Sequence, residues 1–183
     1  IYVSPAHDRV ADSAGRCRPG SVLPEMMTRT VFKASPEQVH ARVTDYERFA
    51  GFIPNVRESR VLDRADTGAE WVFHRLHFPG PVADRVYVIR SSDHASRPQD
   101  GYYRVEWELS GRVFRVLQNA RGVRPDAFDG FWDLRPIEDG KATAARYSVY
   151  SDPGGLVPAW LVTRMTGRYL QQVIMAVRKR LKQ

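Results

Sequence analysis

From about residue 56 onward the hydrophobic period of this chain changes once, and that change limits the folds open to it. Between about residues 56 and 150, apolar residues come in short alternating runs separated by turn residues, the pattern of antiparallel strands. From about residue 156 to 181 they recur at helical spacing. Because a single sheet must cover its apolar face, we expect the final helix to pack across a curved sheet.

A short helix is expected between the first strand and the rest of the sheet. Ser35 can cap that helix, Pro36 suits its first position, and Gln38 lies three residues after the cap. The expected order is therefore a strand, this helix, further strands and the long helix. We expect the strands at 28–34, 57–63, 70–78, 85–90, 102–109, 112–120, 128–135 and 142–150.

Composition indicates a single globular domain with an N-terminal arm. With 183 residues, 43% of them hydrophobic and 27% charged, the chain has neither the composition of a disordered protein nor that of a coiled coil. Residues 1–24 are rich in Pro, Ser, Gly, Asp and Arg, so we expect an irregular arm there, with Tyr2 and Val3 as a stub of strand, and one domain over 25–183. A single cysteine, Cys17, excludes an internal disulfide framework and a Cys-rich zinc site.

The sequence says little about compartment. No run of eighteen apolar residues is present, so no segment is expected to span a membrane. Residues 1–24 lack the charged head and apolar core of a signal peptide, although a leader already removed would leave no trace.

The net charge of +7 comes from 28 Lys and Arg against 21 Asp and Glu. Such a surplus can attract nucleic acid or anionic lipid. The chain has no recognised nucleic-acid motif, and its basic residues are dispersed except near the C-terminus. We therefore expect a solvated basic surface and no nucleic-acid partner.

Several motifs together carry a family resemblance that covers about residues 25–181. The most specific is a Pro-Gly-Gly turn followed by an apolar pair and Pro-Ala-Trp at the head of the final helix. The motifs are Ala34–Val39, Phe52–Val56 followed by Glu58–Leu62, His77–Arg85, Gly130–Leu134 and Ser151–Val162. With them the chain resembles the START-like, helix-grip superfamily of lipid-transfer domains, polyketide cyclases and coenzyme Q-binding proteins.

The resemblance implies an α+β helix-grip fold, in which a curved antiparallel sheet wraps around the long C-terminal helix and leaves a cavity between them. The expected ligand is a lipid or another hydrophobic small molecule, with no cofactor. Related bacterial proteins are often exported, which slightly favours a periplasmic or exported protein. This chain departs from the lipid-transfer pattern in one respect, because Arg85 is followed by Val86 where an acidic partner is usual.

Candidate cavity residues on the strands are the aromatic and polar side chains that share the apolar side of their strand. On the final helix they come from one row of residues at helical spacing, in which Thr163 and Gly167 are small. That row, called the helix row below, is Leu156, Trp160, Thr163, Gly167, Leu170, Ile174, Val177 and Leu181. Plain core packing between sheet and helix is an equally good interpretation for each wall residue. Phe128 and Val149 belong to the same strand faces. The predicted ligand-binding residues are Trp71, His74, Arg85, Tyr103, Trp107, Trp132, Tyr147, Trp160, Thr163, Gly167 and Leu170.

No metal or catalytic residues are predicted. His74 and His77 are three apart on a strand, so they diverge and cannot share a metal ion. Arg85 and Arg90 are five apart, so at most one of them points inward. Motifs for a nucleophile elbow, a phosphate loop or a zinc helix are all missing, and Cys17 lies in a polar arm without an obvious base.

Three functions remain open at this point. The first is non-enzymatic binding or transfer of a hydrophobic ligand. The second is a cyclase, aromatase or dehydratase on the same fold, with Arg85, Arg90, His74 and Tyr103 acting on carbonyl groups. The third is a coenzyme Q-binding chaperone.

The head of the final helix could also touch an anionic membrane during ligand exchange, through 160–162 and the basic Arg164 and Arg168. An ordinary amphipathic helix is the competing interpretation. The oligomeric state cannot be inferred from the sequence.

Overall fold

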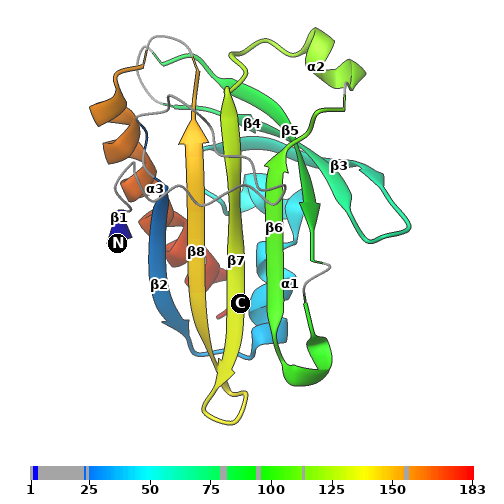
Figure 1. Cartoon of the computed structure of the whole chain (residues 1–183), viewed down its shortest axis with the longest axis vertical. Helices are drawn as coiled ribbons and strands as arrows, with labels where there is room; N and C mark the ends of the chain where they lie inside the picture. The colour runs from blue at the N-terminus through cyan, green and yellow to red at the C-terminus, as the bar shows by residue number, and fades with distance from the viewer. Residues whose placement is uncertain are drawn as a thin grey trace.

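One antiparallel sheet of eight strands forms the body of the protein (Figure 1). The strands lie in the order β1-β2-β8-β7-β6-β5-β4-β3, so the chain crosses the sheet once, from β2 to β3, and then returns strand by strand. Their bounds are Tyr2–Val3 (β1), Met26–Phe32 (β2), Val56–Arg64 (β3), Glu70–Leu76 (β4), Arg85–Ser92 (β5), Tyr103–Leu109 (β6), Ala127–Ile137 (β7) and Ala142–Asp152 (β8).

This computed structural model describes residues 2–3, 23, 25–78, 82–93, 96–112, 114–154 and 157–183. The expected stub of strand at Tyr2–Val3 is confirmed, because β1 pairs antiparallel with Met26 and Met27 of β2. The rest of the expected arm over 1–24, Cys17 included, lies outside the described residues except for Leu23. So does Leu156, with which the predicted helical row begins.

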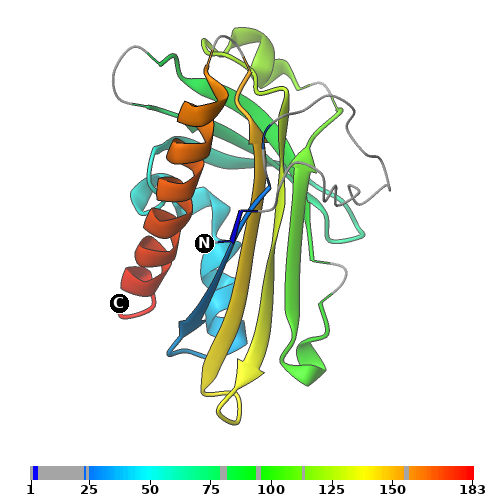
Figure 2. The ribbon, with the colours of Figure 1, turned by 60° about the vertical axis from the view of Figure 1, so that its left-hand side comes forward.

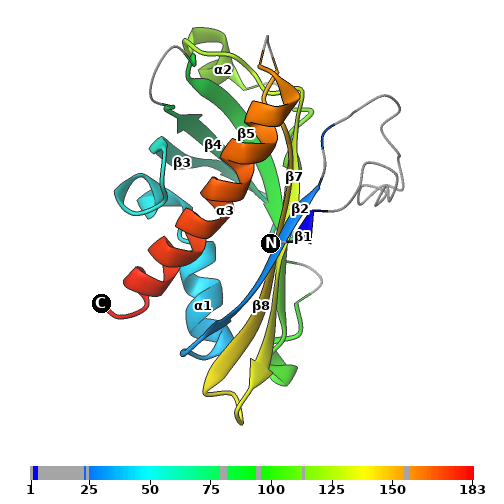
Figure 3. The same ribbon diagram turned by 90° about the vertical axis from the view of Figure 1, so that its left-hand side faces the viewer.

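The long helix α3 (Ala159–Arg180) runs diagonally across one side of the sheet (Figure 3). On the same side lie the short helix α1 (Pro36–Val43) and the 3-10 helix η1 (Tyr46–Gly51) (Figures 2 and 3). The predicted capping box is present: Gln38 N donates to Ser35 Oγ at 3.3 Å, and Ser35 N donates to Gln38 Oε1 at 3.1 Å. The predicted α+β helix-grip architecture is therefore confirmed.

The strand expected at 112–120 is wrong, since that segment contains a short helix, α2 (Arg115–Asn119). The physical reason is that the outer face of β4 and β5 is apolar and has to be covered. Phe73, Val86 and Val88 form a buried apolar cluster there, and the segment packs against it as a cover with Phe114, Val116, Leu117 and Ala120. A further 3-10 turn, η2 (Pro98–Asp100), precedes β6.

The main core lies between the sheet and the three helical segments. Its fully buried members come from both sides, with Val39 of α1 and Leu170 and Val177 of α3 facing Val72 and Leu134 of the sheet. Within the described part of the chain, no helix is both long and apolar enough to cross a membrane.

Candidate ligand cavity

Two adjoining chambers lie in this core, and Leu76, Phe128 and Tyr169 line both. The space free of atoms in them is about 580 Å³ and 570 Å³, open mouths included. The Arg85 chamber is lined by Leu76, Phe78, Val82, Arg85, Phe128, Val149, Ser151, Pro153, Val157, Val162, Met165, Thr166 and Tyr169. The His74 chamber is lined by Val43, Tyr46, Phe49, Ile53, Val56, His74, Leu76, Tyr87, Ile89, Trp107, Phe128, Trp132, Tyr147, Tyr169, Val173 and Val177.

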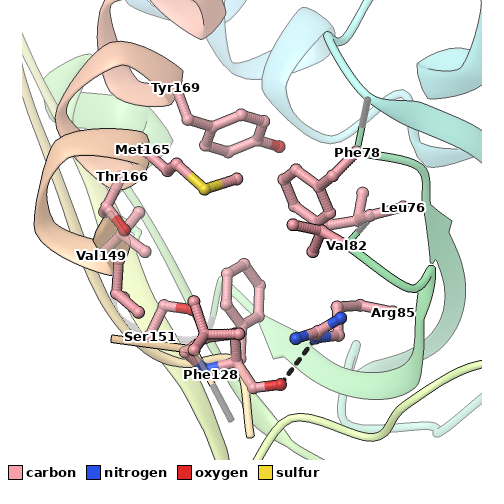
Figure 4. Close-up of a pocket in the computed structure, with 13 residues that line it drawn as sticks. Leu76, Phe78, Val82, Arg85, Phe128, Val149, Ser151, Met165, Thr166 and Tyr169 are labelled. Carbon is pink, nitrogen blue, oxygen red and sulfur yellow. Dashed lines mark hydrogen bonds between the residues drawn. The ribbon is translucent and has the colours of Figure 1, made fainter. Parts of the chain in front are cut away.

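The described lining of the Arg85 chamber is apolar apart from a few groups, of which Arg85 alone is charged. Figure 4 shows Met165 and Tyr169 of α3 across the chamber from Phe78 and Val82, with the guanidinium of Arg85 at its edge. Such a site is of the usual kind for small molecules, mostly hydrophobic with few polar groups.

Arg85 is 4% exposed, and backbone carbonyls hold its guanidinium. Its Nε donates to the carbonyl of Pro153 at 2.7 Å, and its terminal nitrogens donate to the carbonyls of Ala83 at 2.5 Å and Gly154 at 3.2 Å. Burial lowers the pKa of Arg85 from its ordinary value. The side chain thereby ties the start of β5 to the turn before α3.

Gly154 makes that turn possible. Its φ is +65°, a left-handed conformation that glycine adopts without steric cost. A Cβ there would also come within 2.8 Å of the Arg124 carbonyl oxygen. The backbone at Pro153 and Gly154 therefore presents two carbonyls to Arg85.

The His74 chamber is aromatic. Trp132 and Tyr147 stack with ring centroids 4.1 Å apart, and Tyr87 lies 5.0 Å from Phe128 and 5.6 Å from His74. Stacked and tilted pairs of this kind are favourable, and the stiff rings keep the walls in place.

Several polar atoms of this chamber have no hydrogen-bond partner among the described residues. Of these atoms, the indole nitrogen of Trp107 is fully buried. The ring of His74 and the hydroxyls of Tyr87, Tyr147 and Tyr169 form no hydrogen bond that shifts their pKa values. The hydroxyl of Tyr46, by contrast, bonds Ser91 Oγ at 2.6 Å. Burial lowers the pKa of His74 to about 3 and raises the pKa values of Tyr87, Tyr147 and Tyr169. At neutral pH the imidazole is uncharged and the three phenols keep their protons.

Five of the eleven predicted site residues line the cavity. They are Arg85 in one chamber and His74, Trp107, Trp132 and Tyr147 in the other. The related expectation for Phe128 and Val149 places them correctly in the wall. Gly130 assists this wall, because a Cβ there would lie 2.5 Å from Trp107 Cζ2, so only glycine lets that indole pack against β7.

Two of the other predicted residues lie on the wrong part of the sheet. Trp71 faces the opposite side of β4, where it packs with the outer cluster under Arg112, whose guanidinium carbon is 5.1 Å from its ring centroid. Tyr103 lies at the far end of β6, stacked on His40 of α1 at 4.6 Å. Arg90 is exposed, as expected if only one of the two β5 arginines points inward.

Trp160, Thr163, Gly167 and Leu170, the predicted site residues of α3, do not lie on the face of the helix that lines the cavity. Trp160 is 67% exposed, and Leu170 is buried in the core without lining either chamber. Gly167 lies against β2, where a Cβ would be 3.1 Å from Met26 Cε, and Thr163 lies one turn before it. The small residue at 167 allows the close approach of helix and strand rather than of a ligand.

The face of α3 that lines the cavity is Val162, Met165, Thr166, Tyr169, Val173 and Val177. Sequence reasoning also missed Tyr46, Phe49 and Ile53 in and after η1, and Tyr87 and Ile89 on β5. The signal for the last two was available, since they share the strand parity of Arg85. Around the cavity, as elsewhere in the described residues, no cluster of potential metal ligands is present.

Comparison with known proteins now places this fold. A family model described as polyketide cyclase/dehydrase and lipid transport matches residues 32–178. The chain belongs to this family. An uncharacterised protein of Pseudomonas aeruginosa is 26% identical over 132 residues, which are 72% of this chain and 62% of that protein. The chain thus matches less than two thirds of that relative's length.

Solved structures with a similar fold include both a lipid-transfer protein and a cyclase. A STAR-related lipid transfer protein fragment from Xanthomonas axonopodis is similar with a TM-score of 0.76 and 26% identity, covering 92% of this chain and 91% of that one. The Zhui aromatase/cyclase of a Streptomyces species has a TM-score of 0.63 and 11% identity, covering 86% and 93%. The second likeness concerns the fold alone.

Proposed function

We propose that this protein binds one lipid or other hydrophobic small molecule in its cavity without changing it chemically. The main support for this proposal is that the titratable side chains lining the cavity have pKa values far from neutral pH. His74, with a pKa of about 3, is a weak base, and the tyrosines, with raised pKa values, are weak acids. Among the described lining residues there is no carboxylate. General acid–base catalysis is most efficient with groups that titrate near the working pH, and the described lining residues include no such group.

The apolar lining supports binding in a direct way. Each Å² of apolar ligand surface removed from water contributes roughly 25 cal/mol. Shielding a ligand from water is the whole mechanism of a carrier, and a few polar groups suffice to orient the ligand. The likeness to a protein described as lipid transfer supports the same function.

A cyclase or aromatase is the second candidate, and one observation favours it. The buried, unpaired indole nitrogen of Trp107, together with His74 and the tyrosine hydroxyls of the same chamber, could hold the carbonyl oxygens of a reactive polyketone in a fixed fold. Arg85 could polarise a carbonyl from the adjoining chamber. Tyr103 and Arg90, which we expected to take part, line neither chamber. Conversion of a short polyketone surrogate by the purified protein would favour this function over binding.

The exposed head of α3 suggests how a ligand could enter. Trp160, Arg164 and Arg168 are exposed, while Val162 on the same turns lines the Arg85 chamber. We propose transient contact of this end with an anionic membrane surface. Replacing Trp160 with Ala should slow ligand uptake from liposomes and leave binding at equilibrium unchanged.

The first test is native mass spectrometry of gently purified protein, followed by organic extraction of whatever it retains. We expect one bound lipid or hydrophobic molecule per chain; a recovered quinone would favour the quinone chaperone. Thr166→Trp, which fills the Arg85 chamber, should lower the affinity for that molecule at least tenfold. Met175→Trp is the matched control, because Met175 lies on the same helix and is 66% exposed. Protein that retains nothing and takes up nothing from liposomes would contradict the proposal.

A further inference from the structure

The described residues include two charged side chains that are buried, and only one of them has oppositely charged partners among the described residues. Asp133, 1% exposed on the outer face of β7, is surrounded by three arginines. Arg146 lies 2.7 Å from its carboxylate, Arg135 3.0 Å and Arg104 3.5 Å. Arg85, 4% exposed in the cavity wall, has no carboxylate within ion-pair distance among the described residues.

Two carboxylates adjoin Arg85 or the turn that it holds, Asp84 and Asp152, and both are occupied elsewhere. Asp84 Oδ1 lies 2.8 Å from His77 Nδ1. Asp152 Oδ1 accepts a hydrogen bond from Gly154 N at 3.2 Å, within the turn that Arg85 holds. The residue after Arg85 is Val86, which belongs to the apolar cluster on the other face of the sheet. No described acidic side chain neutralises the buried guanidinium.

Arg85 also has N–H groups that bond no described residue. A guanidinium has five N–H groups, and three of them bond the carbonyls of Ala83, Pro153 and Gly154. That leaves one N–H on each terminal nitrogen without a partner among the described residues, on a side chain that lines the chamber (Figure 4). The surrounding wall is apolar, with Phe78, Val82 and Met165. A cation that has N–H groups without described partners, and that lies among apolar side chains, can select a ligand group of opposite charge.

We infer that the ligand carries an anionic oxygen group, a carboxylate or a phosphate, which binds Arg85 while its hydrophobic part extends toward the His74 chamber. This inference rests on the proposed binding function. Charge-assisted hydrogen bonds from arginine to carboxylate or phosphate are about twice as strong as neutral ones. In a water-poor chamber the attraction between the two charges is larger still. A buried cation without its counter-charge is costly, and such a ligand removes that cost.

The test compares probes that share one hydrocarbon chain and differ in the head group. Oleate, oleyl alcohol, methyl oleate and oleoyl lysophosphatidate are each titrated calorimetrically below their aggregation concentrations. We expect oleate, the lysophosphatidate or both to bind at least tenfold more tightly than the alcohol and the ester. Which of the two anions binds better distinguishes a carboxylate ligand from a phosphate ligand.

The outcomes separate the two proposals. Equal affinity for all four probes would overturn the anionic ligand and leave the hydrophobic carrier standing. Failure of all four to bind would overturn both. Because these comparisons use the unmodified protein, they do not depend on how a variant folds.

Variants then assign the effect to Arg85. Arg85→Met should abolish the preference for anions, and Arg85→Lys should keep part of it, because lysine retains the charge but not the planar fork. Arg90→Met is the matched control on the same strand, since Arg90 is exposed on the outer face. A preference for anions that survives in Arg85→Met protein with a native thermal transition would overturn the inference.

Discussion

Most side chains on both faces of strands β4 and β5 are buried, yet only one face lines the two chambers. The outer face carries Phe73, Val86 and Val88, and the segment around α2 fills the space over it. The inner face carries His74, Arg85 and Tyr87, and the space over it remains partly empty. Burial of a residue therefore does not identify a ligand site in this protein.

The difference lies in the polar atoms. The buried members of the outer cluster are a phenylalanine and two valines, whose side chains have no hydrogen-bonding needs. The inner face holds aromatic rings with polar atoms. The ring nitrogens of His74 and the hydroxyl of Tyr87 form no hydrogen bond with a described residue that shifts their pKa values. Unpaired buried polar groups are uncommon in native proteins and call for an explanation. The ligand proposed above would supply one.

The largest effect on stability should come from the filled face. Phe73→Ala should lower the free energy of unfolding by about 3–5 kcal/mol, because it leaves a cavity in a fully packed cluster. Ile89→Ala, on the inner face of β5, should cost about 2–3 kcal/mol and weaken ligand binding as well. Urea denaturation and calorimetric titration of both variants measure the two effects. A Phe73→Ala protein that unfolds like the wild type would show that the outer face is not tightly packed.

The next effect concerns acid. Unfolded His74 has an ordinary pKa of 6.5, whereas in the folded protein burial lowers it to about 3. The unfolded state therefore binds the proton first, and stability is lost as pH falls from 6.5 toward 3, by at most about 1.4 kcal/mol per pH unit. His74→Gln should reduce this loss by roughly 2 kcal/mol between pH 6 and pH 4.

Unfolding curves of both proteins across that pH range provide the measurement. His40, whose pKa is also lowered by burial, contributes in both proteins and leaves their difference unaffected. Parallel pH dependences for the two proteins would mean that His74 can take up a proton in the folded state.

The smallest effect separates two inward-facing tyrosines. Tyr46→Phe removes a hydroxyl that bonds Ser91 Oγ at 2.6 Å, so it should cost about 1 kcal/mol of stability. Tyr87→Phe removes a hydroxyl without a partner and should change the stability of the empty protein by less than about 0.5 kcal/mol. Thermal denaturation of the empty and the loaded protein measures both. A loss from Tyr87→Phe as large as that from Tyr46→Phe in the empty protein would indicate an undetected partner, such as water.

Local sequence rules predicted most of the elements. The alternation of Tyr103, Val105 and Trp107 predicted β6 and its inner face, and Ser35 and Gln38 predicted the start of α1. The same parity placed Trp107, Trp132 and Tyr147 in the cavity wall. These rules succeed because strand period and helix capping depend on neighbours within a few residues.

They failed where both faces of an element are apolar. Every residue from Arg85 to Ile89 is buried, and Trp71 belongs to the filled face of β4 although its type suggested a ligand contact. The segment at 112–120 contains a helix because the apolar face beneath it comes from strands that precede it in the chain. Alternation cannot tell an inner from an outer face when both are covered.

By itself, the sequence determined most of the strands, the short capped helix and the long final helix, but not which of Arg85 and Arg90 points inward. Only the tertiary structure decided which face of α3 looks into the cavity, because that depends on how the helix crosses the sheet. Gly167 lets the helix approach Met26 of β2, and this contact turns Val162, Thr166 and Tyr169 toward the chambers. The tertiary structure also decided that no described carboxylate reaches Arg85, since such pairs join residues far apart in the chain and follow no local period.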